Sequence, residues 1–158
     1  MSAAQQNPAP ESLSKARLRL WLRLLKASGE VEAELRRRLR AEFETTLPRF
    51  DVMAALARAP EGLRMSEISE RLRVSNGNIT GIVDRLVQEG LALRMAVPGD
   101  RRAMVARLTP KGKDVFAEQA HAHEGWINAL LGGLEGEALA AMTRHLEQMT
   151  SHIEKERN

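Results

Sequence analysis

The side chains best suited to chemistry in this sequence are hydrogen-bonding groups at the start of a predicted helix. The run consists of Ser75, Asn76, Gly77, Asn78 and Thr80. An asparagine can make two hydrogen bonds to adenine, and a serine or threonine can bind a phosphate or a base edge. These residue types at this spacing predict contacts to nucleic acid. A polar, capped helix in a plain helical bundle is the alternative explanation of the same pattern.

A second group with binding chemistry lies in the stretch VPGDRRAMVARLTPKG, residues 97–112. The residues Val-Pro-Gly at 97–99 predict a turn, and Asp100, Arg101 and Arg102 follow at its tip. The arginines could enter an A·T-rich minor groove, whose narrow width strengthens the negative potential. Asp100 could hold an arginine in position through a charge-assisted hydrogen bond. A solvated turn is the alternative, but a preceding pair of helices favours a contact with DNA.

Three further polar residues complete the set of predicted DNA contacts. They are Ser66, Arg85 and Arg94. Ser66 is placed to cap the first of two short helices, Arg85 lies on the second helix, and Arg94 lies in the first strand of the hairpin. A hydroxyl or guanidinium at such places can bind a phosphate.

Catalytic and metal-binding chemistry find little support in the sequence. The chain has no cysteine, which excludes disulfides, thiolate nucleophiles and zinc-thiolate sites. We find no phosphate-binding glycine loop, no nucleophile elbow with a Ser-His-Asp order, and no metal-ligand spacing. His121 and His123 would point to different helix faces, and His145 and His152 share a face without further ligands. The sequence therefore predicts no enzyme, no metal site and no cofactor.

The predicted helices and strands that carry these groups form a winged helix-turn-helix. Ser66 begins a helix that ends near Leu72, and Ser75 caps a second helix over residues 78–88. The second helix turns Ile79, Ile82, Val83 and Leu86 inward, and Gly90 ends it. Residues 91–97 and 103–108 alternate or run apolar on either side of the Pro-Gly turn, as in a β-hairpin. A helix of this kind fits the major groove of DNA, where its N-terminal residues reach base edges.

Long helices flank this predicted lobe on both sides. Residues 13–45 contain no proline and predict one long helix, in which Ser28-Gly29 is the expected place for any bend. Pro48 fits the first turn of a helix that ends at Pro60, and Thr109 caps a helix that begins at Pro110. A final helix carries one apolar stripe made of Leu134, Ala138, Met142, Leu146, Met149 and Ile153. The fold class is therefore mainly α with a small β-hairpin wing.

The sequence divides into three regions by these patterns. Residues 1–12 read as a flexible tail, residues 47–109 as the winged helix-turn-helix domain, and residues 13–46 with 110–153 as a helical dimerisation region. The terminal stripe has little to bury against in one small lobe, which favours a second chain over a monomeric helical cap.

The charge of the chain permits a nucleic-acid partner without requiring one. Lys and Arg number 24 against 21 Asp and Glu, for a net charge of +3. A local basic surface would suit nucleic acid or an anionic ligand, while an ordinary soluble protein with Arg-rich helix faces is equally compatible. No apolar stretch approaches the roughly 20 residues needed to cross a membrane. The first residues lack the pattern of a signal peptide, so we expect a cytoplasmic protein without membrane contact.

The stretch ISERLRVSNGNITGIVDRLVQEGLALR, followed by GDRRAMVARLTPKG, resembles the MarR family of bacterial transcriptional regulators. The resemblance covers nearly the whole chain, and the DRR…LT..G pattern behind a helix-turn-helix is specific. The wing in this family often carries a further Asp and a basic residue before its Asp-Arg pair, where this sequence has Val-Pro-Gly at 97–99. We therefore expect the least DNA contact on that side of the wing.

Membership of this family would imply an intertwined homodimer that binds a pseudo-palindromic operator in double-stranded DNA. It would also imply a repressor that a small aromatic acid or its coenzyme A thioester releases from DNA. Candidate effector contacts are Trp21, Ser28, Arg49, Phe50 and Met53. The Arg49 guanidinium could bind a carboxylate or phosphate, or could form an inter-helix salt bridge; Trp21 could equally serve in packing. A DNA-binding or architectural protein without a ligand is the alternative function.

Overall fold

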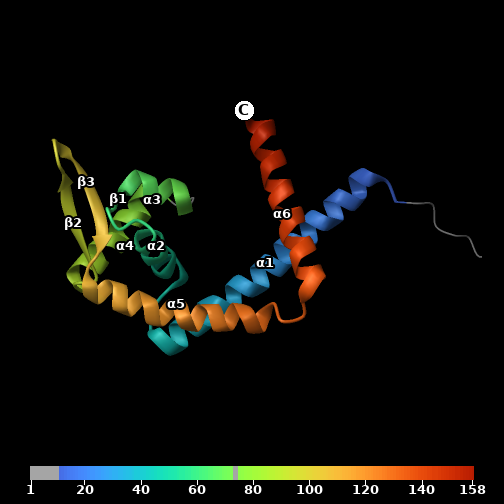
Figure 1. Cartoon of the computed structure of the whole chain (residues 1–158), viewed down its shortest axis with the longest axis horizontal. Helices are drawn as coiled ribbons and strands as arrows, with labels where there is room; N and C mark the ends of the chain where they lie inside the picture. The colour runs from blue at the N-terminus through green and yellow to red at the C-terminus, as the bar shows by residue number, and fades with distance from the viewer. Residues whose placement is uncertain (1–10, 73–74) are drawn as a thin grey trace, which may run out of the picture. The chain divides into compact units, whose positions relative to one another are not determined.

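The computed structural model describes residues 11–72 and 75–158. The chain divides into two units, and the boundary along the sequence falls between Glu44 and Thr45. We describe each unit by itself. The first contains helix α1 (Leu13–Phe43). The second contains α2 (Leu47–Ala57), β1 (Leu63–Arg64), α3 (Met65–Leu72), α4 (Asn76–Gln88), β2 (Ala92–Val97), β3 (Asp100–Leu108), α5 (Pro110–Leu130) and α6 (Gly136–Arg157) (Figure 1). The predicted fold class, mainly α with a small β wing, is confirmed.

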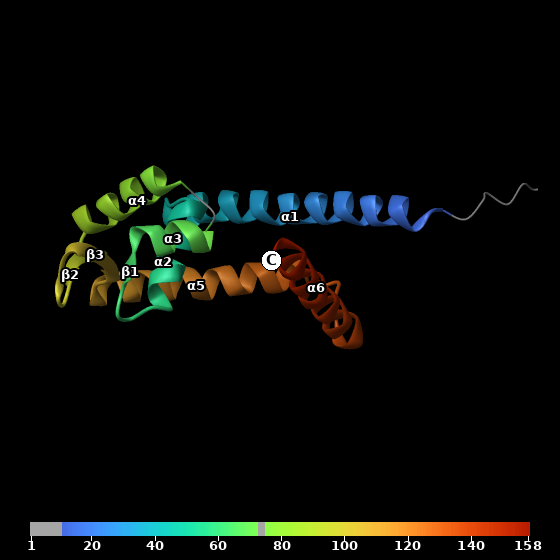
Figure 2. The ribbon, with the colours of Figure 1, turned by 90° about the horizontal axis from the view of Figure 1, so that it is seen from above.

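Helix α1 runs without interruption from Leu13 to Phe43. The hydroxyl of Ser12 accepts the backbone N–H of Lys15 at its start, and Glu44 ends it in the left-handed conformation with φ 51°. The helix continues straight through Ser28-Gly29, so the possible bend there is absent (Figure 2). Leu35 and Leu39 are buried, whereas Leu18, Trp21 and Leu25 in the N-terminal half are exposed.

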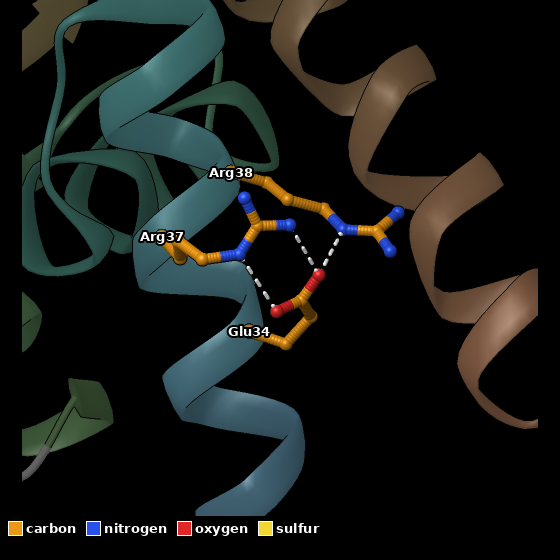
Figure 3. A network of polar contacts seen from close by, with 3 residues as sticks. All are labelled: Glu34, Arg37 and Arg38. Atoms are coloured by element: carbon orange, nitrogen blue, oxygen red, sulfur yellow. Dashed lines mark hydrogen bonds and ion pairs between the residues drawn. The ribbon is translucent and has the colours of Figure 1, made fainter.

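A local ion network covers one turn of α1. The Glu34 carboxylate accepts hydrogen bonds from Arg37 Nε and Nη2 at 2.9 and 2.7 Å. Arg38 Nε donates to the same carboxylate at 2.6 Å (Figure 3). These spacings of three and four residues bring side chains together on a helix surface. The two guanidinium groups lower the pKa of Glu34 to about 2.

The second unit is built around a three-stranded antiparallel sheet in the order β1-β3-β2. Strands β2 and β3 pair from Ala92↔Leu108 to Ala96↔Met104, and an irregularity follows between Ala96 and Val97. Their hairpin, called the wing below, turns at Gly99, whose φ of +84° suits a residue without Cβ. The sequence did not reveal strand β1, because two residues are too few to show an alternating pattern.

The core of this unit lies between α2, α3, α4 and the sheet. Ile68 on α3 and Ile79, Val83 and Leu86 on α4 are fully buried. Three of the four inward residues predicted for the second helix are thus confirmed, and Ile82 is half-buried against the same core. The core holds α4 by one face, while Gly77, Asn78 and Arg85 on other sides of the helix are exposed.

The starts of α3 and α4 differ from the predicted ones. Helix α3 begins at Met65, so Ser66 lies inside its first turn and the prediction of Ser66 as the cap is wrong. The chain enters α3 directly from strand β1, and the Glu67 carboxylate binds the Arg64 backbone N–H at 2.7 Å. Helix α4 begins at Asn76, two residues earlier than predicted, with Ser75 as its confirmed cap.

Two helices, α5 and α6, follow the wing. Thr109 caps α5 by accepting the Gly112 N–H at 3.0 Å, and Pro110 occupies the first turn as predicted. Helix α6 begins at Gly136, which leaves Leu134 outside it and corrects the first member of the predicted stripe. The remaining large apolar side chains of the stripe, Met142, Leu146, Met149 and Ile153, are exposed.

Candidate nucleic-acid interface

The N-terminal turn of α4 presents small polar residues on its exposed face. Ser75, Gly77 and Asn78 are exposed, and Thr80 is half-buried. The side chain of Asn76 lies outside the described residues. Ser75 Oγ accepts the backbone N–H of Asn78 at 3.4 Å, which fixes the start of the helix and leaves the Asn78 amide at the surface. A helix start of this kind can offer both side chains and backbone N–H groups to a ligand.

The predicted contact residue Arg94 binds another part of the lobe. Its Nη2 atom lies 2.6 Å from Asp84 Oδ1, so the first strand of the wing is tied to α4. Arg94 and Asp84 lie 10 positions apart on opposite sides of a turn, a spacing that gave no signal in the sequence. Arg85, the next residue on α4, is exposed, as is Ser66 on α3.

The tip of the wing is fixed by Asp100. Its Oδ1 atom accepts the backbone N–H of Arg102 at 3.1 Å. The expected charge-assisted hydrogen bond therefore exists, but its donor is the backbone N–H of Arg102, two residues further along the chain. The Arg102 side chain is exposed, and that of Arg101 lies outside the described residues.

Among the predicted effector residues, Arg49 forms a salt bridge. Its Nη1 atom donates to Glu89 Oε1 at 3.0 Å, and its Nη2 atom donates to Glu89 Oε2. The Arg49 guanidinium lowers the pKa of the Glu89 carboxyl below its ordinary value. Of the two roles that the sequence left open for Arg49, the inter-helix salt bridge is the one present. Glu89 was missed because its partner lies 40 positions away in the sequence.

The other predicted effector residues lie in contrasting surroundings. Met53 is fully buried in the core, and Phe50 is buried with its ring stacked on His123 at 4.7 Å. Burial lowers the pKa of His123, and the charge of Asp51 opposes that shift. Trp21 and Ser28 belong to α1, where both are exposed.

Other kinds of site are not apparent in the described part of the chain. Residues 11–72 and 75–158 contain no group of three or more His, Asp or Glu side chains arranged to hold a metal ion. Within these same ranges, the helices are either too short or too polar to cross a membrane.

A pair of short helices followed by an antiparallel hairpin defines a winged helix-turn-helix protein. A model of the MarR family matches residues 45–104. The HTH-type transcriptional regulator PecS of Dickeya dadantii is 29% identical over 112 residues, which cover 60% of this chain and 68% of PecS.

Solved structures extend the likeness to nearly the whole chain. The crystal structure of a MarR family transcriptional regulator from Silicibacter pomeroyi is 30% identical, with a TM-score of 0.76 over 91% of this chain and 99% of that chain. A MarR variant from E. coli complexed with operator DNA shares the fold at 21% identity, with a TM-score of 0.73 over 88% and 99% of the two chains. This chain belongs to the MarR family. It is a DNA-binding transcriptional regulator and not an enzyme.

Proposed function

We propose that this regulator is a homodimeric, cytoplasmic repressor that binds a pseudo-palindromic operator and is released by a small aromatic acid or its coenzyme A thioester. One observation carries the DNA-binding half of this proposal. The polar residues Ser75 and Asn78 at the start of α4 are exposed, while Ile79, Val83 and Leu86 on its inner face are fully buried. Such a helix can enter the major groove without changing its own packing.

The proposed DNA contacts divide by chemistry. Ser75, Asn76, Gly77 and Asn78 at the start of α4 would meet base edges and nearby phosphates. Arg101 and Arg102 on the wing would enter the minor groove, where Asp100 supports the turn that carries them. The flanking residues Ser66, Thr80 and Arg85 would add contacts to phosphates.

The proposed dimer rests on exposed apolar side chains. Trp21, Leu22 and Leu25 are exposed on α1, and Leu146 and Ile153 are exposed on α6. Contiguous apolar stripes on helices are typical of surfaces that a second chain covers. We infer that residues 13–46 and 110–153 build the dimer and that residues 47–109 bind DNA. A two-fold dimer would place its two recognition helices about 34 Å apart, one turn of DNA.

The proposed effector site draws on the aromatic residues between α2 and α5. The Phe50 ring lies 5.5 Å from that of Phe116 and stacks on His123. Gln119 Oε1, one turn from both α5 rings, is buried and has no hydrogen-bond partner among the described residues. An aromatic compound with a hydrogen-bond donor would suit both features. Trp21, Ser28 and Met53 remain candidate contacts, and an acid that binds Arg49 would compete with Glu89.

Replacement of Asn78 by Ala tests the DNA-binding half of the proposal. We expect a loss of about 1–3 kcal/mol of binding free energy on the operator and a much smaller loss on random DNA, because a base contact is removed. Gln88→Ala, which removes an exposed amide from the other end of α4, is the matched control. Fluorescence anisotropy with both DNAs measures the effect. An equal loss on the two DNAs would show that Asn78 does not read sequence.

Release from DNA by a defined compound tests the effector half. Benzoate, phenylacetate and their coenzyme A thioesters are titrated into the protein–operator complex, and thermal unfolding is measured in parallel. Since a ligand of the native state raises its stability, a compound that releases DNA should also raise the melting temperature of the free protein. If none of the four compounds changes the binding of the protein to DNA, a ligand-independent regulator is favoured.

A further inference from the structure

The C-terminal end of α4 is held by two other helices. From α2, the Arg49 guanidinium binds both carboxylate oxygens of Glu89, the residue that caps α4. From α5, Lys111 Nζ donates to the backbone carbonyl of Glu89 at 3.3 Å. Thr109 Oγ1 donates to the carbonyl of Gly90 at 2.7 Å. We call Arg49, Glu89, Thr109 and Lys111 the α4 clamp.

Close backbone packing reinforces the clamp where α5 begins. The Thr109 backbone N–H donates to the Leu91 carbonyl at 3.0 Å. A Cβ atom at Gly112 would lie 1.9 Å from that same Leu91 oxygen, so only glycine permits this approach. The three residues that leave α4, positions 89–91, are thus fixed to the first turn of α5.

The charges of the central ion pair are opposite to those that isolated helices favour. Glu89 places a carboxylate at the negative C-terminal end of α4, and Arg49 places a cation in the first turn of α2. Local helix stability would favour the reverse arrangement at both positions. The Arg49 side chain is 21% exposed and that of Glu89 is 48% exposed, so water screens the pair only in part. The benefit of the pair must therefore come from joining the two helices.

We propose that Arg49, Glu89 and Lys111 are positioning residues for operator recognition. They set the orientation of α4 on α2 and α5 from the end opposite to the proposed base contacts. Their effect on DNA is indirect, because a carboxylate would repel phosphates and Arg49 is occupied by Glu89. The inference rests on the proposed role of α4 as the helix that reads the operator.

The variant Glu89→Gln tests this proposal, because it keeps the shape of the side chain and removes its charge. We expect operator affinity to fall about tenfold, while affinity for random DNA and the salt dependence of binding stay unchanged, since no phosphate contact is lost. Glu61→Gln is the matched control, as it removes one exposed carboxylate from the same lobe, between α2 and β1. It should leave both affinities unchanged.

The exchange variant, Arg49→Glu combined with Glu89→Arg, provides rescue. It restores the pair with the charges that the helix ends favour, so the protein should be folded and should recover most of the operator-to-random affinity ratio. The single variant Glu89→Arg should not recover it. A folded Glu89→Gln protein with an unchanged ratio would overturn the proposal. If Glu89→Gln does not fold, the exchange variant decides. An operator-to-random affinity ratio no higher than that of Glu89→Arg would then overturn the proposal.

Asn78→Ala, measured in the same series, separates the two proposals. A normal operator-to-random ratio for Asn78→Ala would remove the basis for α4 as the reading helix. If the operator-to-random ratio falls for Asn78→Ala but stays normal for Glu89→Gln, α4 remains the helix that reads the operator. Only the positioning role of the α4 clamp is then rejected.

Discussion

The winged lobe and the long flanking helices use their apolar residues in opposite ways. In the lobe, Ile68, Ile79 and Val83 are fully buried around one core. On the N-terminal half of α1 and on α6, large apolar side chains are exposed, with Trp21 at 54% and Ile153 at 50%. The lobe therefore gains its stability from its own chain, whereas the helices carry apolar surface that a second chain would cover.

In the proposed function, the winged lobe would recognise DNA, and the exposed stripes on α1 and α6 would join two chains. A rigid lobe can hold α4 and the wing in fixed orientation, because both are tied to the same core. The exposed stripes would set the distance between two such lobes. In this account, the affinity of one lobe for DNA and the spacing of two lobes can be changed independently.

The largest effect is expected in the core of the lobe. Leu86→Ala removes a fully buried side chain and should lower the free energy of unfolding by about 2–5 kcal/mol, because a cavity remains. Chemical denaturation at two protein concentrations measures this loss. We expect the same loss at both concentrations, since the residue packs within one chain. A loss below about 1 kcal/mol would contradict a tightly packed lobe.

A charge on the α6 stripe should act on assembly. Leu146→Glu is expected to shift the protein from dimer to monomer in analytical ultracentrifugation. Operator affinity should fall by about 100-fold, because the two half-sites are no longer bound together. The lobe should stay folded, in contrast to the core variant. Glu147→Gln on the same helix serves as the control, and an unchanged molecular mass for Leu146→Glu would reject the stripe as an interface.

The wing should contribute a smaller, salt-sensitive part of DNA binding. Arg102→Ala is expected to weaken operator binding and to reduce the slope of log affinity against log salt concentration by about one unit. Arg144→Ala on α6 also removes one exposed positive charge, but should leave the slope unchanged. If the two variants change the slope equally, the effect of Arg102 is a general charge effect.

The smallest effect is expected on α1, from Glu34. Arg37 and Arg38 lower its pKa from 4.5 to about 2. The ionised carboxylate therefore stabilises the folded state fully above pH 4.5, and this contribution is lost as the pH falls toward 2. Thermal unfolding of the wild type and Glu34→Gln should differ slightly at pH 7 and converge near pH 2. A difference that stays constant over this range would contradict the network.

The sequence revealed the parts of the fold that repeat or have local signals. Ser75, Thr109 and Gly90 mark the helix ends by their residue types, and the inward face of α4 followed from its helical spacing. Ser66 was misplaced because strand β1 leads directly into α3, and two paired residues leave no pattern. Helix caps and hairpins are local, so one sequence can indicate them.

The site was less predictable, because its internal contacts join distant positions. The Arg49–Glu89 and Arg94–Asp84 pairs depend on how helices and strands pack, which residue spacing does not encode. From its charge, Arg94 was expected to contact DNA, and Arg49 to bind either an effector or an acid on another helix. The structure pairs each of them with an acid in the lobe. At the wing tip Asp100 and Arg102 are exposed, as are Ser75, Gly77 and Asn78 at the start of α4.

Selection of bound sequences from a random DNA library tests whether the protein reads a two-fold symmetric site with α4 and the wing. The purified protein is incubated with the library near physiological salt, and the retained DNA is sequenced. A homodimer that reads DNA with α4 and the wing should enrich an inverted repeat whose half-sites lie about 10 base pairs apart. Retained DNA with no common motif, or with a motif that lacks two-fold symmetry, would contradict the account.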